Sequence, residues 1–194
     1  QLFRPYAPTT YNLTIHNSFF DIIGSNAGFT VTAMNGTYIL NSNFTHFSTF
    51  FGSGTAGTIH YFLNTTFNIR PSSASNVSVA WFFSVNVTDL DGAAVNGANV
   101  TLYDKNNAFI FSVLTPASGL TALENVTEFT TISSVKSLYT NFTLITTYSN
   151  YPISNISINI TRSMQQNVIL PAQAGLILNF TYPTPDNGTT IITN

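Results

Sequence analysis

The chain contains no cysteine, and this absence excludes several kinds of site. Without thiols there can be no disulfide scaffold, no thiolate-bound metal and no haem attached through a C-x-x-C-H motif. Charge is scarce as well, at 6% of 194 residues, whereas about a quarter is usual for soluble proteins. The five Lys and Arg residues form no basic stripe, so we expect no nucleic acid as a partner and no binding to an anionic membrane.

Long hydrophobic runs are missing too. The apolar stretches are short and alternate with polar residues, well below the roughly 18 residues of a membrane helix, so we expect no membrane insertion. The sequence starts at Gln1 and has no basic start followed by an apolar segment. This pattern is typical of a secreted chain whose signal peptide has been removed, and it predicts an extracellular location at the cell surface.

Catalytic and metal-binding patterns are equally sparse. His16, His46 and His60 are far apart in the sequence, and none has a partner at the spacing of metal ligands. Asp89 and Asp91 could belong to a calcium loop or a glycosidase carboxylate pair, but an Asp-Gly step is more typical of a turn. No G-x-S-x-G motif or phosphate-binding glycine loop occurs. We therefore expect no enzyme, no metal and no cofactor.

The low number of carboxylates also predicts a response to acid. Acid unfolding comes mostly from protonating carboxylates that are paired in the folded state, and this chain has only seven Asp and Glu residues. We expect its stability to vary little between neutral pH and about pH 2 to 3.

What the sequence has in excess is the N-glycosylation pattern N-x-S/T. It occurs thirteen times, whereas chance would give roughly six in a chain of this composition. Asn-, Ser- and Thr-rich strands could also produce the pattern without selection, and this alternative stays open. We expect N-linked glycans at Asn12, Asn35, Asn43, Asn64, Asn76, Asn86, Asn99, Asn125, Asn141, Asn155, Asn159, Asn179 and Asn187.

The clearest secondary-structure signal extends from Asn76 to Leu114. In its first part, large apolar residues recur at every second position and mostly polar residues lie between them, which predicts a half-buried strand over residues 76–88. Turn residues then reverse the chain at Asp89 to Gly92 and again at Asn96-Gly97. The apolar positions of the first strand are Val77, Val79, Trp81, Phe83, Val85 and Val87.

No segment of the chain sustains a helical period. The stretch from Leu120 to Phe129 carries Glu124 and Glu128 at helical spacing, so it fits a short helix or an irregular strand. We expect an all-β chain built as an immunoglobulin-like β-sandwich with an extended N-terminal strand. Residues 1–24 are predicted to be an extended leader and candidate donor strand, and residues 25–194 a β-sandwich head domain.

A weak internal repeat supports an alternative fold. The segments Asn17 to Phe20, Asn41 to Phe44 and Asn64 to Phe67 resemble one another and recur about every 23 residues, the length of one coil in a parallel β-helix. The alternative is a short right-handed parallel β-helix in residues 11–69 followed by a β-sandwich. Accidental repetition in an Asn-rich chain is the rival explanation, and the Asn35-Gly36 step favours an antiparallel hairpin instead.

One segment resembles a known kind of surface module. Residues 85–104 match the run V-x-V-x-D-x-x-G-x-x-V-x-G-A-x-V-x-L-x-D, which is typical of carboxypeptidase-regulatory-like and related immunoglobulin-like modules. A later T-D-x-x-G element of these modules corresponds to Thr115 to Gly119, with Pro116 in place of Asp. The resemblance implies a sandwich of about seven strands.

In overall character the chain resembles subunits of archaeal surface filaments of the thread type, which are similar to bacterial type-I pilins. The shared features are dense sequons, few charges, no cysteine, and an extended leader before a sandwich. The resemblance implies a linear polymer of identical subunits that serves adhesion or biofilm formation. In such polymers the N-terminal segment of each subunit completes the sandwich of its neighbour by donor-strand complementation.

The segment from Tyr11 to Ile23 suits that role, because it is long for a strand and follows a leader that contains Pro5 and Pro8. It could equally be the first strand of its own sandwich. A non-polymerising surface-layer, viral coat or carbohydrate-binding module remains the alternative function, with Tyr6, Tyr11 and Tyr103 available to stack on sugars. The predicted groove-filling residues of the donor strand are Tyr11, Leu13, Ile15 and Phe19.

Overall fold

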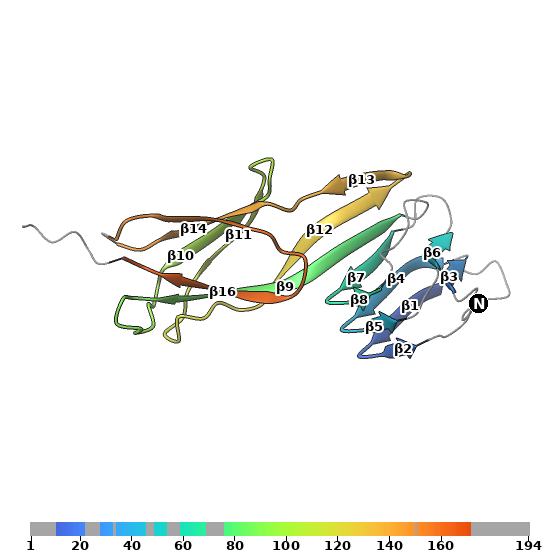
Figure 1. Ribbon diagram of the computed structural model, residues 1–194, viewed down its shortest axis with the longest axis horizontal. Helices are drawn as coiled ribbons and strands as arrows, with labels where there is room; N and C mark the ends of the chain where they lie inside the picture. The colour runs from blue at the N-terminus through green and yellow to red at the C-terminus, as the bar shows by residue number, and fades with distance from the viewer. Residues whose placement is uncertain are drawn as a thin grey trace, which may run out of the picture.

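The structure is a computed structural model that describes residues 11–21, 28–32, 34–45, 49–53, 59–68, 76–149 and 151–171. Every regular element in these ranges is a β-strand, which confirms the all-β prediction. Because this part of the chain has no helix, it has none long and apolar enough to cross a membrane. Figure 1 shows short stacked coils at one end and a β-sandwich at the other, with strand β9 running between them.

The first section of the chain winds through three coils whose equivalent strands pair in parallel. The strands are β1 (Tyr11–His16), β2 (Phe19–Asp21), β3 (Gly28–Thr32), β4 (Met34–Leu40), β5 (Asn43–Thr45), β6 (Thr49–Ser53), β7 (His60–Leu63) and β8 (Thr66–Phe67). They form three parallel ladders, β1-β4-β7, β2-β5-β8 and β3-β6. This is the parallel β-helix arrangement that the 23-residue repeat predicts for residues 11–69.

One expectation about this section is corrected by the pairing. The Asn35-Gly36 step makes no hairpin, because both residues lie inside β4, which pairs in parallel with β1 and β7. Met34 and Gly36 are registered with successive residues of β1, so Asn35 is an extra residue at a register shift and the chain continues along β1 without turning. Strand β1 shares a ladder with β4 and β7, and β2 shares one with β5 and β8, so sheet pairing joins strands on both sides of the predicted boundary at residue 24.

Strand β9 (Val77–Thr88) belongs to both sections of the molecule. Along one edge its first half pairs in parallel with β7, and its second half pairs in parallel with β16 (Met164–Ile169). The other edge pairs with β12 (Glu124–Ile132) in antiparallel fashion. The predicted alternation is confirmed, because the six apolar residues assigned to one face are each at most 3% exposed.

The second section is a β-sandwich. One layer contains β9, β12, β13 (Val135–Leu138) and β16, and the other contains β10 (Asn99–Tyr103), β11 (Phe109–Leu114), β14 (Phe142–Thr147) and β15 (Ser154–Ile158) in the order β11-β10-β14-β15. Phe83 and Phe111 come from opposite layers, with ring centroids 6.4 Å apart. One cluster of buried residues continues from this sandwich into the coils through Ile39 and Phe62, so both sections share a core.

The segment that fitted a helix or an irregular strand is strand β12. The register between β12 and β9 shifts between Thr127 and Phe129, which makes Glu128 an extra residue in a β-bulge. Glu124 and Glu128 are four residues apart, a spacing that places two residues on one face of a strand as well as of a helix, so it does not distinguish the two.

Candidate functional site

An asparagine ladder runs along the corner that follows the first strand of each coil. Asn17, Asn41 and Asn64 occupy this corner, all in the left-handed backbone region, with φ of 49°, 48° and 48°. Asparagine tolerates this conformation better than most residues. The Asn64 Nδ2 group donates a hydrogen bond of 2.8 Å to Oδ1 of Asn41, so two successive coils are joined through their side chains.

The ladder continues into the sandwich through Ser163, which lies just before β16. The Ser163 hydroxyl donates to Asn64 Oδ1 at 2.6 Å and accepts the backbone N–H of Phe82 at 2.9 Å. The repeated asparagines in the sequence predict the corner positions. They do not predict Ser163, which is far away in the sequence and belongs to no repeat.

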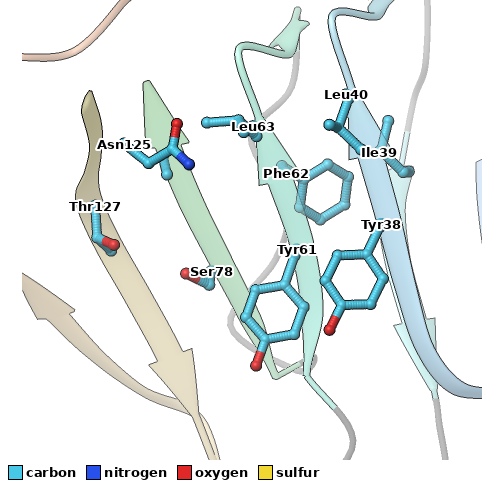
Figure 2. Close-up of a pocket in the computed structure, with 10 residues that line it drawn as sticks. Tyr38, Ile39, Leu40, Tyr61, Phe62, Leu63, Ser78, Asn125 and Thr127 are labelled. Carbon is cyan, nitrogen blue, oxygen red and sulfur yellow. The ribbon is translucent and has the colours of Figure 1, made fainter. Parts of the chain in front are cut away.

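A groove of about 350 Å³ opens on the outer face of the large sheet, across β4, β7, β9 and β12. We call it the tyrosine groove, because Tyr38 and Tyr61 lie next to each other in it, as Figure 2 shows. Their ring centroids are 4.9 Å apart and their planes differ by 7°. Ser78, Asn125 and Thr127 contribute polar groups to the lining, and Leu40, Leu63 and Ala80 are among the apolar residues there.

Sequence reasoning missed this tyrosine pair, although a signal for it exists. Tyr38 and Tyr61 are 23 residues apart, the same distance that separates Asn41 from Asn64, and they are direct partners in the register of β4 and β7. Among the tyrosines predicted to stack on sugars, Tyr103 instead packs edge to face against Phe109, at 6.1 Å. Tyr6 and the side chain of Tyr11 lie outside the described residues.

The sequons whose side chains the structure describes lie at positions that solvent reaches. Nine of the thirteen have a described side chain, and none of these nine is buried. The side chains of Asn12 and Asn35 and all of Asn179 and Asn187 lie outside the described part of the chain. The exposed members are Asn125, Asn141, Asn155 and Asn159, and the half-buried ones are Asn43, Asn64, Asn76, Asn86 and Asn99.

The predicted donor strand is divided between two sheets. Leu13 and Ile15 lie on β1, where Ile15 is 8% exposed and Leu13 packs against the same core. Phe19 lies on β2 and is 66% exposed. Strand β1 is the end strand of its sheet and pairs with β4 of its own chain, and the apolar face of β9 is likewise buried within the chain.

The Asp89 carboxylate serves a turn, as the Asp-Gly step predicts. Its Oδ1 accepts the backbone N–H groups of Asp91 at 3.0 Å and Ala93 at 2.8 Å. Within the described ranges, no three His, Asp or Glu side chains form a group that could hold a metal ion.

His60 on β7 is a buried titratable residue. Its side chain is 3% exposed, and burial lowers the pKa of the imidazole below its ordinary value of 6.5. The Nδ1 atom has no hydrogen-bond partner among the described residues. His16, by contrast, is exposed on β1, and His46 lies outside the described ranges.

A buried polar pair lies where the coils meet the sandwich. Trp81 Nε1 donates a hydrogen bond of 2.7 Å to Oε2 of Glu128, and both residues are 3% exposed. The sequence does not predict this contact. Glu128 lies on the same inward phase of β12 as Val126, and the bulge then places Phe129 on the interior side as well. The buried bond fixes β12 against β9 at this joint.

Comparisons with known proteins place the chain in no family. No family model matches it, and no curated protein matches it. Among solved structures, the Bacillus anthracis TIE protein is similar over 55% of this chain, with a TM-score of 0.37 and 13% identity. The matched region spans only 18% of that protein.

Proposed function

We propose that the chain is the structural subunit of an extracellular, N-glycosylated filament that assembles head to tail and serves adhesion or biofilm formation. The observation that supports this best is the position of β1, which ends the large sheet and forms the coil farthest from the sandwich (Figure 1). In this proposal β1 leaves its own β4 and pairs with β4 of a neighbouring copy in the same register.

The exchange would preserve the contacts that β1 makes. Strand β1 pairs only with β4 among the described strands, and Ile15 and Leu13 supply its apolar contacts to the core. The β1 strand of a second copy offers the same side chains and the same backbone groups. Such swapping of an identical element is a low-cost route to assembly, and it gives an open polymer when each copy donates to the next one along.

The surface chemistry fits a glycoprotein polymer. With 6% charged residues, the protein has few charges that could hydrate its surface or keep its exposed strand edges from pairing with other chains. Glycans on the unburied sequons would do both. The sequons of the described part are spread over the coils and both layers of the sandwich, so glycans would cover much of the subunit.

The second candidate is a surface-layer, viral coat or carbohydrate-binding glycoprotein that does not polymerise by strand donation. It is favoured by the pairing of β1 with β4 inside one chain, because a chain paired in this way needs no neighbour to complete its core. Deleting residues 1–24 does not separate the two candidates, since the deletion removes β1 and β2 and would destabilise a monomer as well as a polymer.

A pair of cysteines across β1 and β4 does separate them. His16 and Leu40 are direct partners in the register, and adjacent strands lie about 4.8 Å apart, which suits a disulfide. The native chain has no cysteine that could interfere. The double variant His16→Cys/Leu40→Cys would be oxidised and examined by non-reducing denaturing gel and by negative-stain microscopy, with each single variant as a control.

Strand donation predicts filaments in the images and a ladder of covalently linked chains on the gel, which neither single variant produces. Filaments in which every disulfide joins two cysteines of the same chain would overturn strand donation. If only monomers appear, both by microscopy and on the gel, the filament proposal is wrong and the second candidate is favoured.

A further inference from the structure

The tyrosine groove is an exposed aromatic site that the filament proposal does not use. Tyr38 is 46% exposed and Tyr61 is 38% exposed, although both are large side chains at the centre of a sheet. Leaving two neighbouring rings in water forgoes the free energy that burying them would provide. A surface of this kind is typical of a binding site.

The chemistry of the groove fits a neutral sugar. Among the described residues that line it none is charged, so it offers no attraction for an anion or a cation. The two rings offer flat apolar surface to the C–H face of a pyranose, and Ser78, Asn125 and Thr127 offer hydroxyl and amide groups to its hydroxyls. Apolar walls with a few polar groups are the usual composition of a small-molecule site.

The sequence places a source of sugar in the wall of the groove. Asn125 is the acceptor of the sequon Asn125-Val126-Thr127, and its exposed side chain lines the groove together with Thr127. Val126, between them, is fully buried, so the two polar residues point to the open side of β12. Strand β9 alone separates β12 from β7, so the strands that carry Asn125 and Tyr61 are about 10 Å apart across the sheet. Asn125 is the partner of Phe82 and Tyr61 the partner of Ser78, so the two also lie about 13 Å apart along the strands, a distance that a glycan of a few sugars spans.

We propose that the N-linked glycan of Asn125 folds back along the tyrosine groove and packs sugars of its chain on Tyr61 and Tyr38. This inference rests on the proposal that the surface is glycosylated, and it assigns a specific structural role to one glycan. Because Asn125 belongs to the sandwich strand β12 while Tyr38 and Tyr61 belong to the coils, the glycan links the two sections of the subunit across the outer face.

The test is a double-mutant cycle on the secreted protein, made in a host that modifies N-x-S/T sequons. Four chains are compared, namely the native sequence, Asn125→Gln, Tyr38→Ser/Tyr61→Ser, and the combination of all three changes. Glycopeptide mass spectrometry gives the occupancy of Asn125, and thermal unfolding gives Tm. Asn155→Gln is the matched control, because Asn155 is an exposed sequon on β15, in the other layer of the sandwich.

We expect Asn125→Gln to lower Tm by about 2 to 4 °C in the native background and to have no effect once the tyrosines are replaced. Asn155→Gln should change Tm equally in both backgrounds. A Tyr38→Phe/Tyr61→Phe variant should keep the dependence on Asn125, since the rings remain. The same chains made in a host without glycosylation should show no dependence on Asn125 in either background.

Two results would overturn the inference. An occupied Asn125 whose removal changes Tm equally with and without the tyrosines would show that the glycan does not use the groove. If mass spectrometry finds Asn125 unmodified while Asn155 carries a glycan, no glycan is available to fill the groove. Either result leaves strand donation untouched, whereas empty sequons throughout would also remove glycosylation from the proposed function.

Discussion

At the scale of single residues, Asn64 combines two properties that are rarely required together. It adopts a left-handed backbone conformation, and its amide both donates to Asn41 and accepts from Ser163. Asn64 also begins a sequon, so the same amide nitrogen is the atom that a glycan would use. The ladder gives a structural reason for the asparagine that is independent of glycosylation.

Replacing Asn64 therefore tests the ladder. Asn64→Ala loses two side-chain hydrogen bonds, at about 0.5 to 1.5 kcal/mol each, and adds about 1 to 2 kcal/mol for a left-handed alanine. We expect the free energy of unfolding to fall by about 2 to 5 kcal/mol in denaturant titrations of unglycosylated protein. Asn155→Ala, at an exposed strand position, should change it by less than about 0.5 kcal/mol. Equal effects at the two positions would contradict the role of the ladder.

His60 predicts how stability depends on pH. Its folded pKa lies below the unfolded value of 6.5, so acid protonates the unfolded chain first and favours unfolding. The contribution is fully present above pH 6.5 and is lost as the pH falls toward the lowered folded pKa. His60 thus adds one step to the flat profile that the seven carboxylates predict.

We expect Tm to fall between pH 7 and pH 5 in the native protein and to fall less in His60→Leu, which cannot titrate. Thermal unfolding at several pH values in one buffer series measures this difference. His16→Leu removes an exposed histidine from the same section and should retain the native slope, because His60 is still present. If the Tm of His60→Leu falls with pH as steeply as that of the native protein, another titratable group causes the pH dependence.

At the scale of elements, the turn before β12 depends on one glycine. Gly119 has φ of +74°, and a Cβ atom there would lie 2.6 Å from the backbone oxygen of Val87 on β9. The Gly119 carbonyl also accepts the Val87 N–H at 2.9 Å, so the two segments cannot separate without losing that bond. Gly92 has φ of +82° and nothing within 4 Å of its Cβ position.

The two glycines therefore form a matched pair. Gly92→Ala carries only the free-energy cost of a left-handed backbone conformation. Alanine also lowers the entropy of the unfolded chain, which offsets part of this cost, so we expect a net loss of about 1 kcal/mol. Gly119→Ala adds the clash with β9, and we expect it to lose roughly 3 kcal/mol or more in chemical denaturation. Similar losses for both variants would mean that the turn can move away from β9.

The sequence predicts those features of the strands and turns that are caused by neighbouring residues in the chain. The strand over residues 76–88 and the Asp89 turn follow from alternation and turn chemistry, and the asparagine repeat indicates the coils. The Asn35-Gly36 step misleads because β4 pairs with β1 on either side of it, so the chain continues through a register shift at Asn35 where the local preference favours a turn. The tyrosine groove, Ser163 and the Trp81–Glu128 bond depend on register between distant strands, which no single segment records.

At the scale of the whole molecule, β9 makes the coils and the sandwich one cooperative unit. The strand pairs with both sections, and the buried core is continuous across it. A stack of coils alone would unfold from its free end, because each coil contacts only its neighbours. Here the last coil is paired with the longest strand of the sandwich, so opening either section exposes apolar surface of the other.

This arrangement predicts that core mutations in either section shift one common transition. Ile39→Ala in the coils and Leu102→Ala in the sandwich both remove fully buried side chains, and each should cost about 2 to 5 kcal/mol. Trp81, the single tryptophan, lies at the joint and reports by fluorescence on that region, while circular dichroism reports on all strands. In urea both signals should keep one midpoint for each variant, as two-state unfolding requires. If Ile39→Ala instead splits circular dichroism into two steps while the midpoint of Trp81 fluorescence stays at its native value, the coils unfold independently and β9 does not couple them to the sandwich.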